Sequence, residues 1–279
     1  MPVRIRSGWV GGFDPPHVLT RLIAFAVVLR HGSRTLLILV TAHTPPFVPP
    51  TGYSRIKVVS SFDELVSTRF SGGVNALCWP RALPGDFGEV VEGLGVGKGI
   101  TSVEASRLQN LALTAEGKVA RDILVEDQAL LRSLDLSPSL DCIRGYLDEL
   151  EDGPVPTHVQ SFHVDSATVE ADTYLCTYHG PASEGLRNDE ARRRVDLPEI
   201  RAELLKLHGG ADDDTFLEYL SERFFDLHYA PLPQARPFSF GRHHLWRIAT
   251  EYPDSPVPPC IHRAPATLPG QPPRLLLIS

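Results

Sequence analysis

Cysteine is scarce in this sequence and its spacing fits neither metal nor redox motifs. The 279 residues contain four cysteines, Cys78, Cys142, Cys176 and Cys260, and no two of them form a Cys-x-x-Cys pair. This spacing excludes a zinc ribbon and a thioredoxin-type redox pair. Four cysteines in so long a chain are also too few for a disulfide scaffold. We therefore expect four reduced thiols in a cytoplasmic protein.

The sequence also lacks a long hydrophobic run and an excess of positive charge. The most apolar region, residues 19–42, is interrupted by three arginines and a histidine, which makes it a poor membrane-spanning helix. No apolar stretch near Met1 fits a signal peptide. The formal net charge of −7 argues against binding of nucleic acid or of a membrane surface through bulk charge. We expect neither partner, and the sequence predicts no oligomeric state.

Glycine and proline, by contrast, are abundant, with 22 and 25 residues. Since 42 % of the residues are apolar, the chain can form a core, and the many turns favour short strands. The proline-rich segment 44–51 cannot form regular structure because proline fixes φ and removes a donor. We place a boundary there. Residues 1–43 are predicted to be an N-terminal appendage, a β-hairpin packed on the core, and residues 52–279 the main domain.

The pattern of apolar and capping residues predicts helices followed by strands. Thr101 and Glu104 suit a capping box for a helical stretch to residue 133, broken at Gly117. Ser137-Pro138 suits the start of another helix to residue 150. Further helices are expected at 198–207 and 215–225, and strands at 23–29, 35–41, 158–163, 173–178, 238–249 and 274–278. This order predicts a mainly β fold with a helical buttress, of the α+β class.

The glycine-rich run at 93–100 is predicted to be a flexible linker. Its Gly-Lys pair resembles part of a phosphate-binding loop, but glycine rather than serine or threonine follows Lys98. The run also lacks the register of the dinucleotide-binding fingerprint. We expect no nucleotide site there.

A His-x-Asp pair, a later histidine and a later arginine carry the strongest chemical signal. The spacing of His163 and Asp165 places both side chains on one face of a strand. His262 follows among prolines, and Arg274 opens the last apolar run twelve residues later. Two imidazoles and one carboxylate on one side of an iron ion leave positions open, as in non-haem Fe(II) oxygenases. An arginine supplies a planar fork for a carboxylate.

Together these residues resemble the Fe(II)/2-oxoglutarate-dependent oxygenase superfamily, and within it a little-characterised family known only as a domain of unknown function. The similarity covers roughly residues 60–279 and rests on the segments 73–81, 162–165, 175–181, 262–265 and 274–277. The resemblance implies a double-stranded β-helix core, which is a jelly-roll or cupin-like fold. It implies Fe(II) held by His163, Asp165 and His262, and 2-oxoglutarate anchored by Arg274.

The activity implied by this resemblance is oxidation of an unactivated C–H bond of a small molecule, such as an amino acid or an amine. Hydroxylation, desaturation and ring closure are all compatible with it, and succinate and CO2 are released. Many members of the superfamily have a serine two residues after the arginine, where this chain has Leu276. Tyr174 and Tyr178 are therefore the candidates for the hydroxyl that binds 2-oxoglutarate.

The same residue types also allow simpler interpretations. His163 with Asp165 would suit a surface ion pair, and His262 would suit a solvated loop. Arg274 would suit an ion pair at a sheet edge. Two other functions therefore stay open, a cupin-like metalloenzyme that does not use 2-oxoglutarate and a non-catalytic jelly-roll binding module.

Two further groups of residues compete for a functional role. The adjacent His243 and His244 are a rival metal pair, although neighbouring residues in a strand face opposite sides, so at most one would point inward. A group of four arginines suits either a solvated face or a clamp for a substrate carboxylate: Arg187, Arg192, Arg193 and Arg194.

Overall fold

The chain divides into two units, residues 1–43 and 44–279. The computed structural model describes residues 24–31, 34–41, 47–146, 153–266, 268 and 270–279. In the first unit, strand β1 (Ala24–His31) pairs antiparallel with strand β2 (Arg34–Thr41). These strands lie where the sequence predicts a hairpin. The packing of this hairpin on the main domain stays a prediction.

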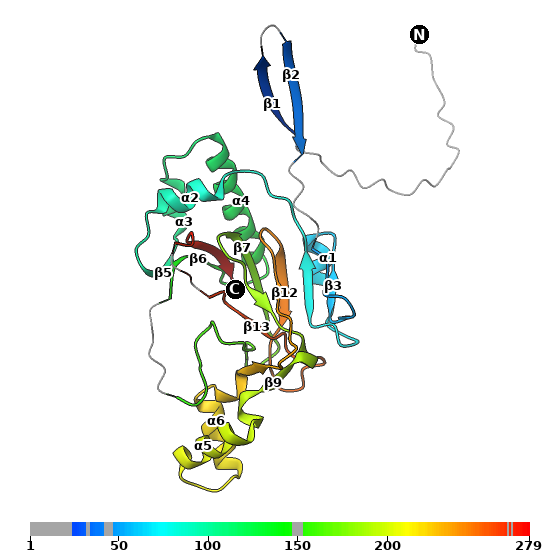
Figure 1. Ribbon diagram of the computed structural model, residues 1–279, viewed down its shortest axis with the longest axis vertical. Coiled ribbons are helices and arrows are strands. Elements are labelled where there is room, and N and C mark those ends of the chain that lie inside the picture. Colours follow the sequence, from blue (N-terminus) through cyan, green and yellow to red (C-terminus); the bar gives the residue numbers. More distant parts are fainter. Residues whose placement is uncertain (1–23, 32–33, 42–46, 147–152, 267, 269) are drawn as a thin grey trace, which may run out of the picture. The chain divides into compact units, whose positions relative to one another are not determined.

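The second unit is built on a seven-stranded sheet (Figure 1). Its strands follow the order β3-β4-β12-β7-β14-β6-β5, and only β3 and β4 pair in parallel. The strands are β3 (Ile56–Val58), β4 (Ala76–Trp79), β5 (Gly99–Ser102), β6 (Ser139–Arg144), β7 (Asp172–His179), β12 (Leu245–Ala249) and β14 (Arg274–Ile278). A large sheet with helices agrees with the β-rich class expected from the sequence.

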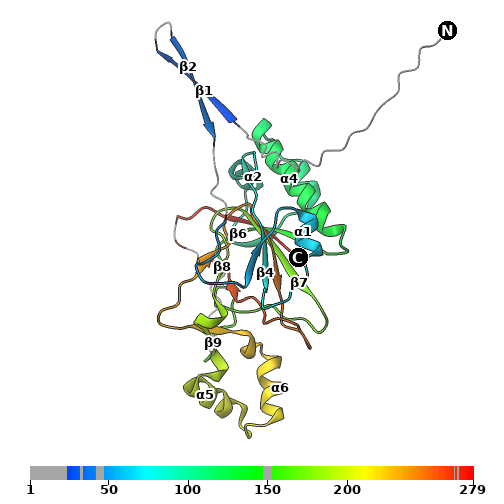
Figure 2. The ribbon, with the colours of Figure 1, turned by 90° about the vertical axis from the view of Figure 1, so that its right-hand side faces the viewer.

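Helices cover one face of this sheet (Figure 2). They are α1 (Phe62–Ser67), α2 (Phe87–Leu94), α3 (Ala105–Gln109) and α4 (Ala115–Arg132). Leu275 and Leu277 of β14 are buried in the core beneath these helices, whereas Leu276 is buried on the other face. Because side chains alternate along a strand, Arg274 lies on the same face of the sheet as Leu276.

Short strands form a second layer against that other face. Strands β11, β8 and β13 make one sheet, and β10 and β9 make another. Their bounds are β8 (Glu184–Gly185), β9 (Ala191–Arg193), β10 (Tyr229–Pro231), β11 (Phe238–Ser239) and β13 (His262–Arg263). His163 links the two small sheets, because it forms antiparallel bridges to His262 on one side and to His228 on the other.

The second helical block lies at the opposite end of this unit from α2 and α4 (Figures 1 and 2). Helix α5 (Pro198–His208) begins with a proline, and Asp213 caps α6 (Asp214–Glu222) by accepting a hydrogen bond from the Thr215 amide. Both helices lie where the sequence predicts them. Three short 3₁₀ turns accompany the block, η1 (Asn188–Glu190), η2 (Arg194–Asp196) and η3 (Phe225–Leu227).

The helix predicted from Ser137 is wrong, because residues 139–144 form strand β6 and no helix lies in the described residues 137–146. Leu140 and Cys142 are buried under the helices, and Ile143 is buried on the other face. A short strand that is buried on both faces has an apolar pattern that periodicity cannot distinguish from a buried helix. Pairing with β14 and β5 decides the conformation.

Five further features differ from the sequence prediction. Thr101 lies in β5, and the helical stretch breaks at residues 110–114 rather than at Gly117. Thr114 caps α4 instead, by accepting a hydrogen bond from the Gly117 amide. The glycine-rich run is no free linker, since Gly95 ends α2 in the left-handed conformation and β5 begins at residue 99. Residues 158–162 form turns, and positive φ at Gly241 and His243 splits the strand predicted at 238–249.

The structure bears on the cysteines and on membrane-spanning helices. All four cysteines are free and buried. No helix in the described part of the chain has the length and apolarity that a membrane crossing requires. A cytoplasmic location stays a prediction.

Gly180 allows β7 and β14 to approach each other beside Arg274. Its φ is +75°, and a Cβ atom there would lie 2.6 Å from the Pro273 carbonyl oxygen. Gly209 has the same φ of +75°, but a Cβ would meet nothing within 4 Å. We expect Gly209→Ala to lower the free energy of unfolding by about 1 kcal/mol through φ alone. Gly180→Ala should lower it by about 1–3 kcal/mol more, since overpacking adds to the strain. Urea unfolding of both variants measures the difference, and equal losses would contradict the close approach.

Candidate functional site

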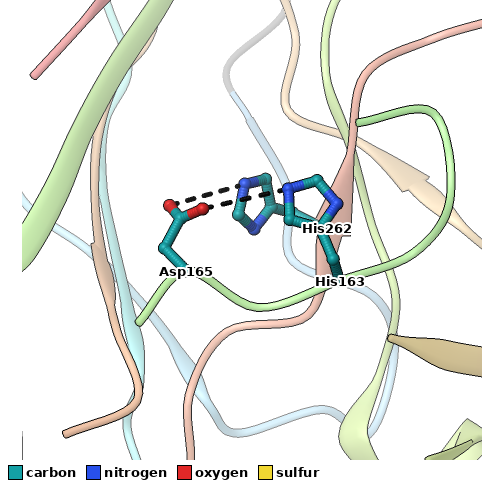
Figure 3. A group of neighbouring side chains, drawn as sticks. All are labelled: His163, Asp165 and His262. Carbon is teal, nitrogen blue, oxygen red and sulfur yellow. Dashed lines mark ion pairs between the residues drawn. The ribbon is translucent and has the colours of Figure 1, made fainter. Parts of the chain in front are cut away.

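His163, Asp165 and His262 come together from two distant segments (Figure 3). His163 and Asp165 lie between β6 and β7, and His262 opens β13. His163 Nε2 is 3.8 Å from Asp165 Oδ1, and His262 Nε2 is 3.7 Å from Asp165 Oδ2. One ligand atom from each residue lies within 4.8 Å of the other two. The three side chains are therefore close enough to share one cation, as the sequence predicts.

Alternation along the chain holds the two histidines on one side. Phe162, Val164 and Ile261 are buried in a separate hydrophobic cluster. Because neighbouring residues of an extended chain point to opposite faces, burial of these three side chains turns His163 and His262 the other way. The backbones of the two histidines exchange a pair of hydrogen bonds of 2.9 Å. The backbone and the core thus fix the positions of both histidines.

In each histidine, Nδ1 contacts a backbone carbonyl oxygen, which leaves Nε2 as the nitrogen that faces the site. His163 Nδ1 lies 2.8 Å from the Ser161 carbonyl oxygen, and His262 Nδ1 lies 3.2 Å from that of Cys260. A carbonyl oxygen only accepts, so each Nδ1 donates, and a neutral ring then has its lone pair on Nε2, which faces the site. Two such imidazoles with one carboxylate make a ligand set that suits Fe(II) and other divalent transition metals.

The local electrostatics favour the protonation states that a metal needs. Burial and the charge of His262 lower the pKa of His163 to about 4, which leaves its ring neutral at pH 7. Burial opposes ionisation of Asp165. The charge of His262 and a hydrogen bond from Thr173, however, hold the pKa of the carboxyl below its usual value. The Thr173 hydroxyl donates to Asp165 Oδ2 at 2.6 Å.

Arg274 is a buried cation that has no acidic partner among the described residues. It is 4 % exposed. Its guanidinium donates to the hydroxyls of Thr177 and Ser183 and, at 3.4 Å, to that of Tyr146, whereas Nε has no partner. Burial lowers the pKa of Arg274. A buried charge without a counter-ion costs several kcal/mol, so this position is suited to an anionic ligand.

Arg274 and the triad lie along the same face of β7. Thr173 contacts Asp165 and Thr177 contacts Arg274. The two threonines are four residues apart and therefore share one face, separated by roughly 13 Å of strand. Across the layer, Ser183 is two residues from Gly185, which is the cross-strand partner of His262. The guanidinium and the candidate metal ligands thus lie in the same layer, between the large sheet and the short strands.

A cavity of about 600 Å³ reaches Arg274. Lys98 and Arg144 also lie in its wall, and no acidic residue does among those that the structure describes. The three triad residues are not part of this wall. The cavity therefore gives an anion access to Arg274. That one ligand contacts both Arg274 and the triad does not follow from this wall.

The rival histidines lie outside the triad. His243 Nε2 donates to the Tyr178 carbonyl oxygen at 3.1 Å, and His244 Nδ1 accepts from the Arg81 amide at 3.2 Å. The only group of three metal-ligating side chains in the described part of the chain is the triad itself. The sequence already favours the triad over the adjacent pair, and among the described residues the structure gathers only the triad.

The two tyrosines proposed to bind 2-oxoglutarate lie on the wrong face of the sheet. Tyr174 and Tyr178 are buried beneath the helices, where the Tyr178 hydroxyl donates to Asp127. They alternate with the threonines that face the site, so their hydroxyls cannot reach Arg274. The hydroxyls that do contact Arg274 are those of Tyr146, Thr177 and Ser183.

Comparison with protein-family models, with curated proteins and with solved structures finds no match for this chain. The interpretation of the site therefore rests on its geometry and chemistry.

The hydrogen bond from Thr173 orients the candidate carboxylate ligand. We expect Thr173→Val to weaken Fe(II) binding about 10-fold, in the range seen when a residue that supports a metal ligand is removed. Thr173→Ser retains the hydroxyl and should bind as the wild type does. Anaerobic calorimetric titration measures both affinities, and equal loss in the two variants would contradict a role for the hydroxyl.

Proposed function

We propose that this protein is an Fe(II)/2-oxoglutarate-dependent oxygenase that acts on a small molecule. The observation that carries the proposal is the buried Arg274, which lacks an acidic partner among the described residues and shares one layer with a His-Asp-His triad. A metal site alone would suit many activities. A metal site with a separate buried guanidinium suits a co-substrate that has a chelating end and a distant carboxylate, as 2-oxoglutarate has.

The arrangement of the strands supports a double-stranded β-helix as the finer description of the fold. The bridges of His163 continue the short strands into one row of neighbours, β11-β8-β13, then His163, then β10-β9. This row packs against the face of the large sheet that carries Arg274. Two facing β layers with a metal site between them are the arrangement that a jelly roll of this superfamily would have.

Different residues of the chain would bind the metal and the co-substrate in the proposed reaction. His163 Nε2, His262 Nε2 and one Asp165 oxygen would hold Fe(II) from one side, which leaves the other side open to ligands. The Arg274 guanidinium would bind the distant carboxylate of 2-oxoglutarate, in a site completed by the hydroxyls of Ser183 and Tyr146. Iron with 2-oxoglutarate and O2, when bound, supplies oxidation of an unactivated C–H bond, with succinate and CO2 as co-products.

The apolar side chains of this layer would keep water away from the reacting groups. Leu175 lies on β7 between the two threonines that face the site, and it is buried with Leu276 and Trp246. Exclusion of water strengthens the contacts of Arg274 with an anion and limits side reactions. The residues present therefore fit both groups that the proposal requires.

One observation favours a second candidate, a cupin-like metalloenzyme that does not use 2-oxoglutarate. The cavity that reaches Arg274 has none of the triad in its wall. In that case the triad would hold Fe(II) or zinc for another reaction, and Arg274 would bind an unrelated anion. The non-catalytic binding module is a third alternative, in which no metal binds.

Anaerobic reconstitution distinguishes these functions. We expect the purified chain with Fe(II) and 2-oxoglutarate to give a weak visible charge-transfer band, and admission of O2 to release succinate. His163→Ala and Arg274→Met should abolish both signals, and His243→Ala should retain them. Stoichiometric metal binding without the band would favour the cupin-like enzyme. Absence of metal binding in folded protein would favour the binding module.

A further inference from the structure

His228 lies next to His163, on the side away from His262, and Arg194 lies next to His228. His163 lies opposite His262 and opposite His228 in two antiparallel bridges. The pairing of β10 with β9 places Tyr229 opposite Arg193. Arg194 follows directly, at the start of η2, and its amide donates to the His228 carbonyl oxygen at 2.8 Å, so the two backbones lie side by side. The bridged residues His163 and His228 lie on one face, roughly 5 Å apart.

The ring of His228 lies beside the candidate metal ligand. Its centroid is 5.7 Å from that of His163, with an interplanar angle of 36°. His228 is 4 % exposed, and its Nδ1 is buried without a hydrogen-bond partner. An imidazole with a free ring nitrogen can form a hydrogen bond with a ligand at this position.

The guanidinium of Arg194 is the second unpartnered group at this end of the row. Its Nε is buried without a partner, and no ion pair is formed by this side chain with any described residue. Burial is the cause that lowers the pKa of Arg194. The Ser161 hydroxyl, two residues before His163, is also buried and unpartnered. Buried polar atoms are nearly always hydrogen-bonded, so the unpartnered atoms of His228, Arg194 and Ser161 call for a polar ligand.

The neighbouring arginines do not share this property. Arg187 is paired with Asp189 and stacks on Tyr53. Arg193, adjacent in sequence, donates from Nε to the Asp226 carbonyl oxygen. Arg192 is exposed. Of the four arginines, Arg194 is therefore the one whose buried nitrogen is left for a ligand.

We propose that Arg194 and His228 form a subsite beside His163 that binds a carboxylate group of the substrate. The identification of this ligand as the substrate rests on the proposed oxygenase function, whereas the subsite itself does not. Arg194 is distinct from Arg274, which contacts β7 and the residues before β8 at the other side of the row. The substrate class would then be a small carboxylic acid, which includes amino acids and excludes simple amines.

Binding of benzoate and of benzamide to the full-length, metal-free protein tests the subsite. The measurements are made in the Arg274→Met variant, so that Arg274 cannot contribute an anion site. We expect benzoate to bind at least 10-fold more tightly than benzamide, because charged hydrogen bonds are stronger than neutral ones. Adding Arg194→Gln should remove this preference. Adding Arg193→Gln should leave it intact, and Arg194→Lys should retain part of it.

Each outcome bears on the proposal. Equal binding of benzoate and benzamide, or equal loss with Arg193→Gln and Arg194→Gln in folded proteins, would overturn the subsite. Loss of 2-oxoglutarate binding in Arg194→Gln but not in Arg274→Met would reverse the roles of the two arginines and also overturn it. An Arg194-dependent preference without succinate release would retain the subsite and reject the oxygenase. Succinate release without that preference would reject the subsite alone.

Discussion

Replacement of His163, Asp165 or His262 by alanine is expected to lower the affinity for Fe(II) by more than about 100-fold. Removal of a group that merely supports a ligand costs roughly 10- to 100-fold, and loss of one of three ligands should cost more. The arrangement leaves no obvious substitute, because the triad is the only group of three metal-ligating side chains in the described part of the chain. Anaerobic titration and measurement of bound metal after gel filtration report the loss.

The matched control for this prediction is His243→Ala. His243 is a half-buried histidine whose Nε2 is already used by the Tyr178 carbonyl oxygen. It should bind metal as the wild type does. Metal also stabilises the protein that binds it, so the melting temperature of the wild type should rise with Fe(II) and that of His163→Ala should not. Unchanged metal content in all three ligand variants would reject the site.

The first two members of the triad could be predicted from the sequence because their signal is local. The spacing of His163 and Asp165 places both on one face of an extended chain, whatever the rest of the fold does. His262 and Arg274 required the resemblance, since nothing in their own spacing says that they meet the first pair. The structure brings His262 to His163 through a single backbone bridge, which no periodicity of either segment encodes.

The second group of site residues could not be predicted, because it depends on pairing. His228 has no motif around it, and it joins the site only because it lies opposite His163. Arg194 stood among four arginines of equal standing, and only the structure shows that its Nε is buried without a partner and that its amide contacts His228. Tyr174 and Tyr178 failed as candidates for a related reason: alternation in β7 is obvious from the sequence, but the side that the helices cover is not.

The errors in the fold have the same origin. Residues 139–144 have an apolar pattern that suits a helix, and their conformation is decided by β14 and β5 on either side. Gly95 and Gly99 look like a linker in the sequence, but one ends a helix and the other begins a strand. The helices that were placed correctly, α5 and α6, carry their own signals in Pro198 and Asp213. Capping residues located these two helices, but the capping pattern at Ser137-Pro138 precedes a strand, so such a signal holds only where strand pairing does not override it.

Arg274→Met is expected to abolish detectable 2-oxoglutarate binding while leaving the ligand-free protein at least as stable as the wild type. Charged hydrogen bonds contribute about 1.5–3 kcal/mol each, so loss of a bidentate contact weakens binding by roughly 100-fold or more. In the ligand-free protein the same guanidinium is buried without a counter-ion among the described residues. Replacement of a buried charge by an apolar side chain of similar volume is often neutral or stabilising by about 1–4 kcal/mol.

Arg247 on β12 provides the contrast that makes this prediction specific. It is also largely buried, but it is paired with Asp172 at 2.6 Å and donates to the carbonyl oxygens of Leu65, Val66 and Thr68. Arg247→Met leaves the Asp172 carboxylate unpaired and should lower the free energy of unfolding by about 3–5 kcal/mol. Urea unfolding of both variants without ligand gives the comparison. A similar large loss in Arg274→Met would mean that Arg274 is a structural residue, and the case for a co-substrate anchor would fall with it.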